Sequence, residues 1–310
     1  MTFAEISIQI LDEVRLTSKS STYVSYRSIL FKRLRHISDV EIEDFDKKAL
    51  LSLRAELLDS SAARNTISST WSMIGKVLSY AAYEYGIDTP WRAYKSIKTI
   101  SKERRVKTSW TKEEWIQFSD TVLNLYVETG KEVHYRYYVL FNYMYYMANR
   151  KGETMALKVE KIDLDNRMAI IDESISYKVL PGYSNQYVTT DRKNHKPLYE
   201  VIPKPLVSIL REYIDTYKLG PHDYLFFRDR PIPPETLRRK MDWYIERAGV
   251  RRITPHQFRH THASVIFASG ESKIEDAYVV AKRLGHSVKY TLDTYGSLYE
   301  DREYKIIDRL

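Results

Sequence analysis

The chain has 310 residues, of which 43% are hydrophobic and 29% are charged, and its 49 Lys and Arg against 41 Asp and Glu give a formal net charge of +8. That length suffices for two domains of ordinary size with a buried core, and the positive charge suits a polyanionic partner. Because the chain contains no cysteine, disulfides, thiolate catalysis and zinc sites built on cysteine are excluded.

The first residues predict a helix rather than a signal peptide. Glu5 and Asp12 interrupt the apolar residues of the N-terminus, and Thr2 with Glu5 forms the pattern of a capping box for a helix over residues 2–17. No apolar run in the sequence approaches the roughly 18 residues that are needed to span a bilayer. We therefore expect no membrane contact and a cytoplasmic location.

Three more helices are predicted before residue 90, because apolar residues recur at helical spacing. A polar break at residues 18–21 separates them from the first helix, and they cover residues 23–34, 47–58 and 63–85. Gly86 and Pro90 end the last one. Together these elements indicate a small all-helical domain, which we place at residues 1–94.

Basic residues gather in two places of this region. The second helix carries Arg27, Lys32 and Arg33. The segment 95–109 has few large apolar residues, so we predict an interdomain linker there. Its cations, opposed by Glu103 alone, are Lys95, Lys98, Lys102, Arg104, Arg105 and Lys107. Either group can be a solvated surface or can lie along a phosphate backbone.

Order resumes at Trp110, and a second domain is predicted over residues 110–310. Its predicted helices cover residues 131–148, 203–217 and 236–248. Residues 187–190 and 198–202 alternate like the two strands of a β-hairpin around a polar turn at 191–197, and residues 167–172 resemble another strand. The predicted fold class is therefore mainly α with a small antiparallel β-sheet: a helical N-terminal domain followed by a mixed α/β domain.

The C-terminal part of this domain carries residues suited to binding an anion. Thr254 is a good helix N-cap, and the residue after it is a proline, which is pre-set for the first helical position. His256 and Arg259 then share a face near the positive end of the helix dipole. Further on, Gly285 is typical of a helix C-cap, which places the next residue at the start of a turn.

The combination H-x-x-R, then L-G-H, then a tyrosine nine residues on resembles the C-terminal half of the tyrosine recombinase (phage integrase) family. Residues 256–261 stand for the family's H-x-L-R-H-T, and residues 284–287 for its L-G-H-S. Upstream, Arg150-x-Gly-Glu153-x-x-x-Leu157 followed by Ile162-Asp163 resembles the family's first arginine motif, G-L-R-x-x-E-L-x-x-L-x-x-x-D-I-D. Ala148-Asn149 departs from the Gly-Leu of that motif, which changes the loop before Arg150.

The resemblance implies a site-specific DNA recombinase or integrase, of the kind found in mobile genetic elements. Such an enzyme cuts and rejoins DNA strands through a 3′-phosphotyrosyl intermediate without a metal, another cofactor or ATP. The implied catalytic residues are Arg150, Lys193, His256, Arg259, His286 and Tyr295. The family's hairpin lysine can be Lys193 or Lys196 here, and we favour Lys193 because it falls earlier in the turn. The N-terminal domain is similar to the family's helical core-binding domain, so we expect DNA contacts from Arg27, Lys32, Arg33, Lys95, Lys98, Lys102, Arg104 and Arg105.

These residue types suit the reaction. A tyrosine can form a covalent ester that conserves the bond energy, and two guanidinium groups can neutralise the transition state bidentately. Because a phenol has a pKa near 10, it needs a proton acceptor, for which His256 is the candidate. Lys193 would protonate the leaving 5′-oxygen, and His286 would donate a hydrogen bond to a nonbridging oxygen.

The implied partner is double-stranded DNA that carries a recombination site, in a bacterial cell or a phage-infected host. The resemblance further implies a homotetramer on two DNA sites, with accessory DNA-bending or directionality factors possible. The residues after Tyr295 would pack either on a neighbouring protomer or as a last helix in cis. We expect no separate arm-binding domain before the helix at residues 2–17.

Other interpretations have specific weaknesses. His256, His260 and His262 suggest a metal site, but Gln257 stands where the H-E-x-x-H motif needs glutamate. Tyr290 and Tyr299 do not have the family's spacing from the L-G-H motif. Two alternatives stay open. A catalytically inactive DNA-binding relative would form no covalent complex, and a type IB topoisomerase would relax supercoiled DNA without a specific site.

Overall fold

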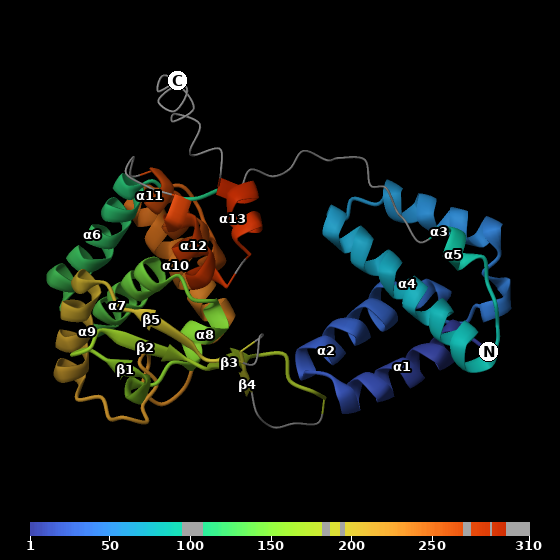
Figure 1. Ribbon diagram of the computed structural model, residues 1–310, viewed down its shortest axis with the longest axis horizontal. Coiled ribbons are helices and arrows are strands. Elements are labelled where there is room, and N and C mark those ends of the chain that lie inside the picture. The colour runs from blue at the N-terminus through green and yellow to red at the C-terminus, as the bar shows by residue number, and fades with distance from the viewer. Residues whose placement is uncertain (95–107, 182–186, 193–195, 269–273, 286, 296–310) are drawn as a thin grey trace, which may run out of the picture. The chain divides into compact units, whose positions relative to one another are not determined.

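The computed structural model describes residues 1–94, 108–181, 187–192, 196–268, 274–285 and 287–295 (Figure 1). The chain divides into two compact units, one of Met1–Arg105 with Lys178–Tyr187 and one of Val106–Tyr177 with Val188–Leu310. The predicted linker at residues 95–109 falls almost entirely outside the described residues, so the domain boundaries remain a prediction. Among the described helices, none combines the length and the low polarity that crossing a membrane requires.

The named elements in the described part of the first unit are all helices. Its elements are α1 (Phe3–Thr17), α2 (Ser20–Ser28), the π-helix η1 (Ile29–Arg33), the 3₁₀ turns η2 (Arg35–Ile37) and η3 (Ile42–Asp44), α3 (Lys47–Asp59), α4 (Arg64–Tyr85) and α5 (Trp91–Tyr94). The capping box predicted for α1 is present, with the N–H of Thr2 bonded to the Glu5 carboxylate at 2.9 Å. In the core, the rings of Trp71 and Trp91 lie 4.9 Å apart. The helices predicted at 2–17, 47–58 and 63–85 are all confirmed.

The second predicted helix is only partly correct. It begins at Ser20, so the polar break is shorter than expected, and it ends as an α-helix at Ser28. The chain then widens into η1, where the N–H of Leu34 reaches the carbonyl of Ile29 at 3.0 Å. This wider turn keeps Leu34 buried while the cations of η1 stay exposed. A helical hydrophobic pattern does not distinguish one π turn from a continuous α-helix.

The second unit packs helices around α7, most of whose residues are buried. The helices are α6 (Lys112–Thr129), α7 (Glu132–Met147), α8 (Lys151–Ala156), η4 (Val159–Lys161), α9 (Lys204–Tyr217), α10 (Pro234–Ala248), η5 (Pro255–Gln257), α11 (Phe258–Ala268), α12 (Ile274–Leu284) and α13 (Val288–Tyr295). Aromatic rings fill the space between α6, α7 and α11. Trp115 stacks on Tyr145 at 4.1 Å, and Phe141 lies 6.1 Å from Phe258. This packing fixes the start of α11, which carries the H-x-x-R motif, against α7.

The strands form two small antiparallel sheets. The strands are β1 (Ile162–Asp163), β2 (Met168–Ile171), β3 (Glu173–Ser176), β4 (Val188–Asp191) and β5 (Leu198–Val201). One sheet has the order β1-β2-β5, and the other pairs β3 with β4. The predicted class, mainly α with a small antiparallel sheet, is confirmed.

The predicted hairpin of residues 187–190 and 198–202 is wrong, because β4 and β5 do not pair with each other. Ile171 of β2 faces Leu198, and Glu173 of β3 faces Asp191. β4 and β5 therefore pair with two consecutive strands, β3 and β2, and not with each other. The N–H of Arg192 still bonds to the carbonyl of Asp172 at 3.2 Å. Alternation of side chains identifies a strand but not its partner.

Candidate active site

Arg150 lies in the short loop between α7 and α8. α7 ends at Met147, and its C-cap is Ala148, whose φ of 53° lies in the left-handed region that usually favours glycine. Arg150 occupies the N-cap of α8: its backbone N–H donates to Oε2 of Glu153 at 2.9 Å, and its Nη1 donates to Oε1 at 3.1 Å. Ala148 thus has the backbone conformation that a glycine would adopt at this position. The Arg150 side chain is 28% exposed.

Glu153 connects Arg150 to the segment that was predicted to carry the lysine. Its Oε1 also accepts a hydrogen bond from Nε of buried Arg192 at 3.1 Å, and Nη1 of Arg192 donates to the carbonyl of Lys196 at 2.9 Å. Burial alone would raise the pKa of Glu153. The N–H of Arg150 and the charges of the two arginines outweigh burial, so that pKa lies below its usual value. Lys193 lies outside the described residues, and the Lys196 side chain is exposed.

Arg259 joins the two signature loops. It is 3% exposed; its Nη1 donates to the carbonyl of Ala148, and its Nη2 donates to the carbonyl of Leu284. These carbonyls stand at the C-terminal ends of α7 and α12, where the helix dipoles favour a cation. One side chain thus holds the loop of Arg150 and the turn of the L-G-H motif together.

His256 lies one turn before Arg259, in the 3₁₀ turn η5 that precedes α11. The N–H of Thr254 bonds to Oε1 of Gln257 at 2.7 Å, so the predicted cap is present although the helix opens with a 3₁₀ turn. The His256 side chain is exposed, and its ring lies 5.9 Å from that of His260, nearly perpendicular to it. This geometry leaves His256 accessible to a substrate.

The L-G-H turn lies against Arg150. α12 ends at Leu284, and Gly285 has a φ of 58°, which confirms the predicted C-cap. A Cβ on residue 285 would meet Nη2 of Arg150 at 3.4 Å, so the guanidinium lies directly beside this backbone. His286 lies outside the described residues. Arg150, Arg259 and the residue before His286 are therefore neighbours in space.

The candidate nucleophile ends a helix. Tyr295 is the last residue of α13, whose start is held by Ser287: its carbonyl accepts from the N–H of Thr291 at 3.0 Å. Val288 and Leu292 pack α13 onto the buried side chains of α11 and α12. The position of the Tyr295 side chain is not among the described features, and residue 299 lies outside them altogether.

Only some of the residues predicted to contact DNA lie in the part of the chain that the structure describes. Arg27, Lys32 and Arg33 are exposed on α2 and η1, whereas Lys95, Lys98, Lys102, Arg104 and Arg105 lie outside the described residues. His262 points inward, and its Nδ1 donates to the carbonyl of Tyr145 at 3.0 Å. In the part of the chain that the structure describes, no three His, Asp or Glu side chains are placed to hold a metal ion.

Sequence reasoning missed Arg192 as a member of this group. It is 6% exposed and bonded to Glu153, but nothing in its neighbourhood in the sequence separates it from the many exposed arginines. Glu153 is part of the first arginine motif, but the motif does not show that its carboxylate bonds to two arginines. Its carboxylate is the point where the Arg150 loop and the lysine segment meet.

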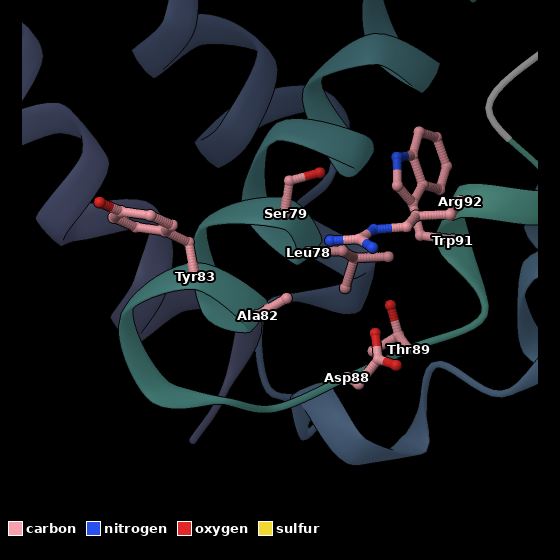
Figure 2. Close-up of a pocket in the computed structure, with 8 residues that line it drawn as sticks. All are labelled: Leu78, Ser79, Ala82, Tyr83, Asp88, Thr89, Trp91 and Arg92. Carbon is pink, nitrogen blue, oxygen red and sulfur yellow. The ribbon is translucent and has the colours of Figure 1, made fainter.

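A separate hollow lies in the first unit. Figure 2 shows it between α4 and the start of α5, with a volume of about 450 Å³. It is lined by Leu78, Ser79, Ala82, Tyr83, Asp88, Thr89, Trp91 and Arg92. None of the residues implicated in catalysis lines it.

The known proteins that this chain resembles are integrases and tyrosine recombinases. A model of the phage integrase family matches residues 111–302. The ICEBs1 integrase of Bacillus subtilis is 24% identical, covering 97% of this chain and 80% of that protein. A tyrosine recombinase of Pseudothermotoga lettingae is 25% identical, covering 89% and 84%.

Solved structures show the same fold. The Tn1549 transposon integrase in complex with a circular intermediate DNA superimposes with a TM-score of 0.76, at 16% identity over the whole of both chains. A lambda integrase dimer bound to a COC′ core site gives 0.69 at 15% identity, covering 96% of this chain and 97% of that one. At these identities the likeness concerns the fold.

Proposed function

Because the chain belongs to the phage integrase family and is a tyrosine-type site-specific recombinase, we propose that it cuts and rejoins double-stranded DNA with Tyr295 as the nucleophile. The observation that carries this proposal is the pair of bonds from Arg259 to the carbonyls of Ala148 and Leu284. They bring three motifs, far apart in the sequence, to one place. Two guanidinium groups that both lie against the turn at Leu284 and Gly285 suit the charge that develops on a phosphorus under attack.

In the proposed reaction, the Tyr295 hydroxyl attacks the scissile phosphorus and loses its proton to His256. A 3′-phosphotyrosyl bond forms while the bond to the 5′-oxygen breaks. Lys193 gives that oxygen a proton, so that a free 5′-hydroxyl leaves. Arg150, Arg259 and His286 hold the nonbridging oxygens. Reversal of the same steps with another 5′-hydroxyl rejoins the strand.

DNA is the proposed partner for both parts of the chain. The net charge of +8 and the exposed Arg27, Lys32 and Arg33 support contact with phosphates from residues 1–94. The solved structures of the Tn1549 integrase and of the lambda integrase dimer contain DNA. We propose that residues 110–310 act on it, that 95–109 is a basic linker, and that four protomers bring two DNA sites together with or without accessory factors.

The test is covalent trapping on a suicide substrate. A duplex selected by binding from a random library is nicked near its centre, so that the cleaved end diffuses away and the protein stays attached. We expect the wild type to give a band of lower mobility in a denaturing gel, and sequencing of the trapped end identifies the phosphodiester that is cut. Tyr295→Phe should give no such band.

The matched control is Tyr290→Phe. Tyr290 is exposed in the same helix, and the change removes the same hydroxyl. This variant should trap as the wild type does. A band from Tyr295→Phe, or its loss in Tyr290→Phe alone, would refute the assignment of the nucleophile.

A further inference from the structure

A buried polar network adjoins the loop of Arg150. Asn149, the residue before it, is 3% exposed. Its Oδ1 accepts a hydrogen bond from the hydroxyl of Tyr143 at 2.8 Å, and its Nδ2 donates to Oε2 of Glu200 at 2.5 Å. Glu200 is also 3% exposed and lies at the inward-facing position of β5. The carboxylate is thus held inside the protein by the amide next to Arg150.

Arg283, near the end of α12, bonds to the backbone on either side of this network. Its Nη1 donates to the carbonyl of Val201 at 3.1 Å, and its Nη2 donates to the carbonyl of Tyr146 at 3.0 Å. The network therefore links β5, the end of α7 and the end of α12. The residues that follow Arg283 are Leu284 and Gly285, which contact Arg259 and Arg150.

Burial of Glu200 needs these partners. Burial raises the pKa of Glu200 above its ordinary value, and the charge of Arg283 and the hydrogen bond from Asn149 act in the opposite direction. A buried carboxylate that loses a hydrogen-bond partner is costly, whereas replacing both partners by apolar groups can be nearly neutral. The family's usual leucine at position 149 could neither accept from Tyr143 nor donate to Glu200.

We propose that Asn149 and Glu200 are positioning residues, which set the cleavage rate by holding the Arg150 loop against the turn at Leu284 and Gly285. This inference rests on the proposed function of Arg150. Both side chains are 3% exposed, so the proposal gives neither of them a contact with DNA. Their effect passes through the backbone, since Asn149 is bonded directly to Arg150, and a displacement of about 1 Å at a reacting group can cost about 100-fold in rate.

The test compares single-turnover cleavage at saturating DNA with DNA affinity. Asn149→Leu leaves the Tyr143 hydroxyl and the Glu200 carboxylate without this partner, and Glu200→Leu leaves the Asn149 amide without its acceptor. We therefore expect either change to slow cleavage by about 10- to 100-fold with affinity changed less than about threefold. Glu200→Gln keeps an oxygen for the Asn149 amide and should cleave within about fivefold of the wild type. Glu246→Leu makes the same change at an exposed glutamate of α10 and serves as the control.

The double variant isolates the hydrogen bond. Asn149→Leu with Glu200→Leu removes both partners together, so it should cleave no more slowly than the slower single variant. Three results would overturn the proposal: Glu200→Leu cleaving as fast as the wild type, Glu200→Gln as slow as Glu200→Leu, or two single effects that simply multiply in the double variant.

A second measurement does not depend on activity. If the wild type forms no covalent complex on any DNA, the proposed function fails, and hydrogen–deuterium exchange of the folded proteins still tests the network. Glu200→Leu should speed amide exchange at residues 148–153 relative to the wild type, and Glu246→Leu should not. Unchanged exchange at those residues in Glu200→Leu would show that Glu200 does not hold the loop.

Discussion

The two arginines of the candidate site differ in how they are held. Arg259 is buried and bonded to the ends of two helices, so its removal disturbs the fold as well as the site. Arg150 is partly exposed, and its Nη1 shares the Glu153 carboxylate with Arg192. When the Arg150 side chain is lost, Glu153 keeps its bonds to Arg192 and to the N–H of residue 150. Arg150 is therefore the arginine whose chemical role can be separated from its structural one.

From this difference we predict that Arg150→Ala folds and binds DNA but cleaves poorly. Loss of one group that stabilises the transition state costs about 100- to 1,000-fold in rate. Single-turnover trapping and a binding titration measure the two effects on the same preparation. Arg211→Ala, which removes an exposed arginine paired with Asp165, is the control and should change neither. Equal cleavage by Arg150→Ala and the wild type would remove Arg150 from the site.

Ala148 holds a left-handed conformation with its methyl group in the core. Left-handed strain in alanine amounts to about 1–2 kcal/mol, and a glycine at this position would relieve it. Glycine would also lose about 0.8 kcal/mol of methyl burial and about 0.5–1 kcal/mol through the greater entropy of the unfolded chain. These contributions nearly cancel, so Ala148→Gly should change the free energy of unfolding by less than about 1 kcal/mol.

Chemical denaturation measures this change. Ala148→Val is the informative companion, because a β-branched residue fits the left-handed region poorly and its extra carbons must enter a filled core. It should destabilise by about 2 kcal/mol or more. A loss above about 2 kcal/mol in Ala148→Gly would mean that the methyl contact outweighs the strain.

At the scale of elements, the position of Arg150 depends on how closely α8 approaches β3. A Cβ on Gly152 would stand 2.5 Å from Oγ of Ser174 and 2.7 Å from the carbonyl oxygen of Ile175. The second contact is with backbone, which cannot turn aside. Glycine at this position is therefore what lets the first turn of α8 lie on the strand.

We predict that Gly152→Ala destabilises the protein by about 1–3 kcal/mol, the usual range for overpacking. Because Arg150 is the N-cap of α8, the displaced helix should also slow cleavage. Gly220→Ala is the matched control, since a Cβ there meets only Oδ2 of Asp223 at 3.7 Å. Melting temperature and trapping rate are measured for both variants. A Gly152→Ala protein as stable and active as Gly220→Ala would contradict the close approach.

At this scale, the sequence predicts the features that depend on residues close together in the chain. The caps of α1 and η5 depend on residues three positions apart, and the sequence predicts an N-cap at both places. The pairing of β4 with β3 and of β5 with β2 depends on residues far apart in the chain, and the hairpin prediction failed for that reason. Motif spacing made Arg150 and Arg259 candidates. Motif spacing could not identify Glu200. An acidic residue in a short strand is expected to be exposed unless it is known which face of the strand points into the protein.

At the scale of the whole molecule, buried ionisable groups concentrate in the second unit. Among the described residues, the fully buried acidic, basic and histidine side chains are His134, Glu153, Arg192, Glu200 and Arg259, and the His262 side chain is partly buried with its Nε2 enclosed. All of them belong to the second unit, whereas the buried polar groups of the first are hydroxyls. The pH dependence of folding should therefore arise in the second unit.

His262 gives this dependence a definite sign. Burial, with the charge of Arg283, lowers its pKa to about 3, and its Nδ1 donates to the carbonyl of Tyr145. An unfolded histidine titrates near 6.5, so below that pH the unfolded chain binds a proton that the folded chain does not. Folding stability should fall by about 1.4 kcal/mol for each unit of pH below about 6.5 from this group alone.

His262→Asn separates this effect from those of the carboxylates. Asparagine can still donate to the Tyr145 carbonyl but does not titrate, while Glu200, whose pKa is raised, and Glu153, whose pKa is lowered, remain in both proteins. Between about pH 7.5 and pH 5, the wild type should therefore lose about 2 kcal/mol more stability than the variant. His222→Asn, at a side chain that is 85% exposed, should follow the wild-type curve. If the curves of the wild type and His262→Asn ran parallel, His262 would bind its proton in the folded protein as readily as in the unfolded chain, and burial could not be lowering its pKa.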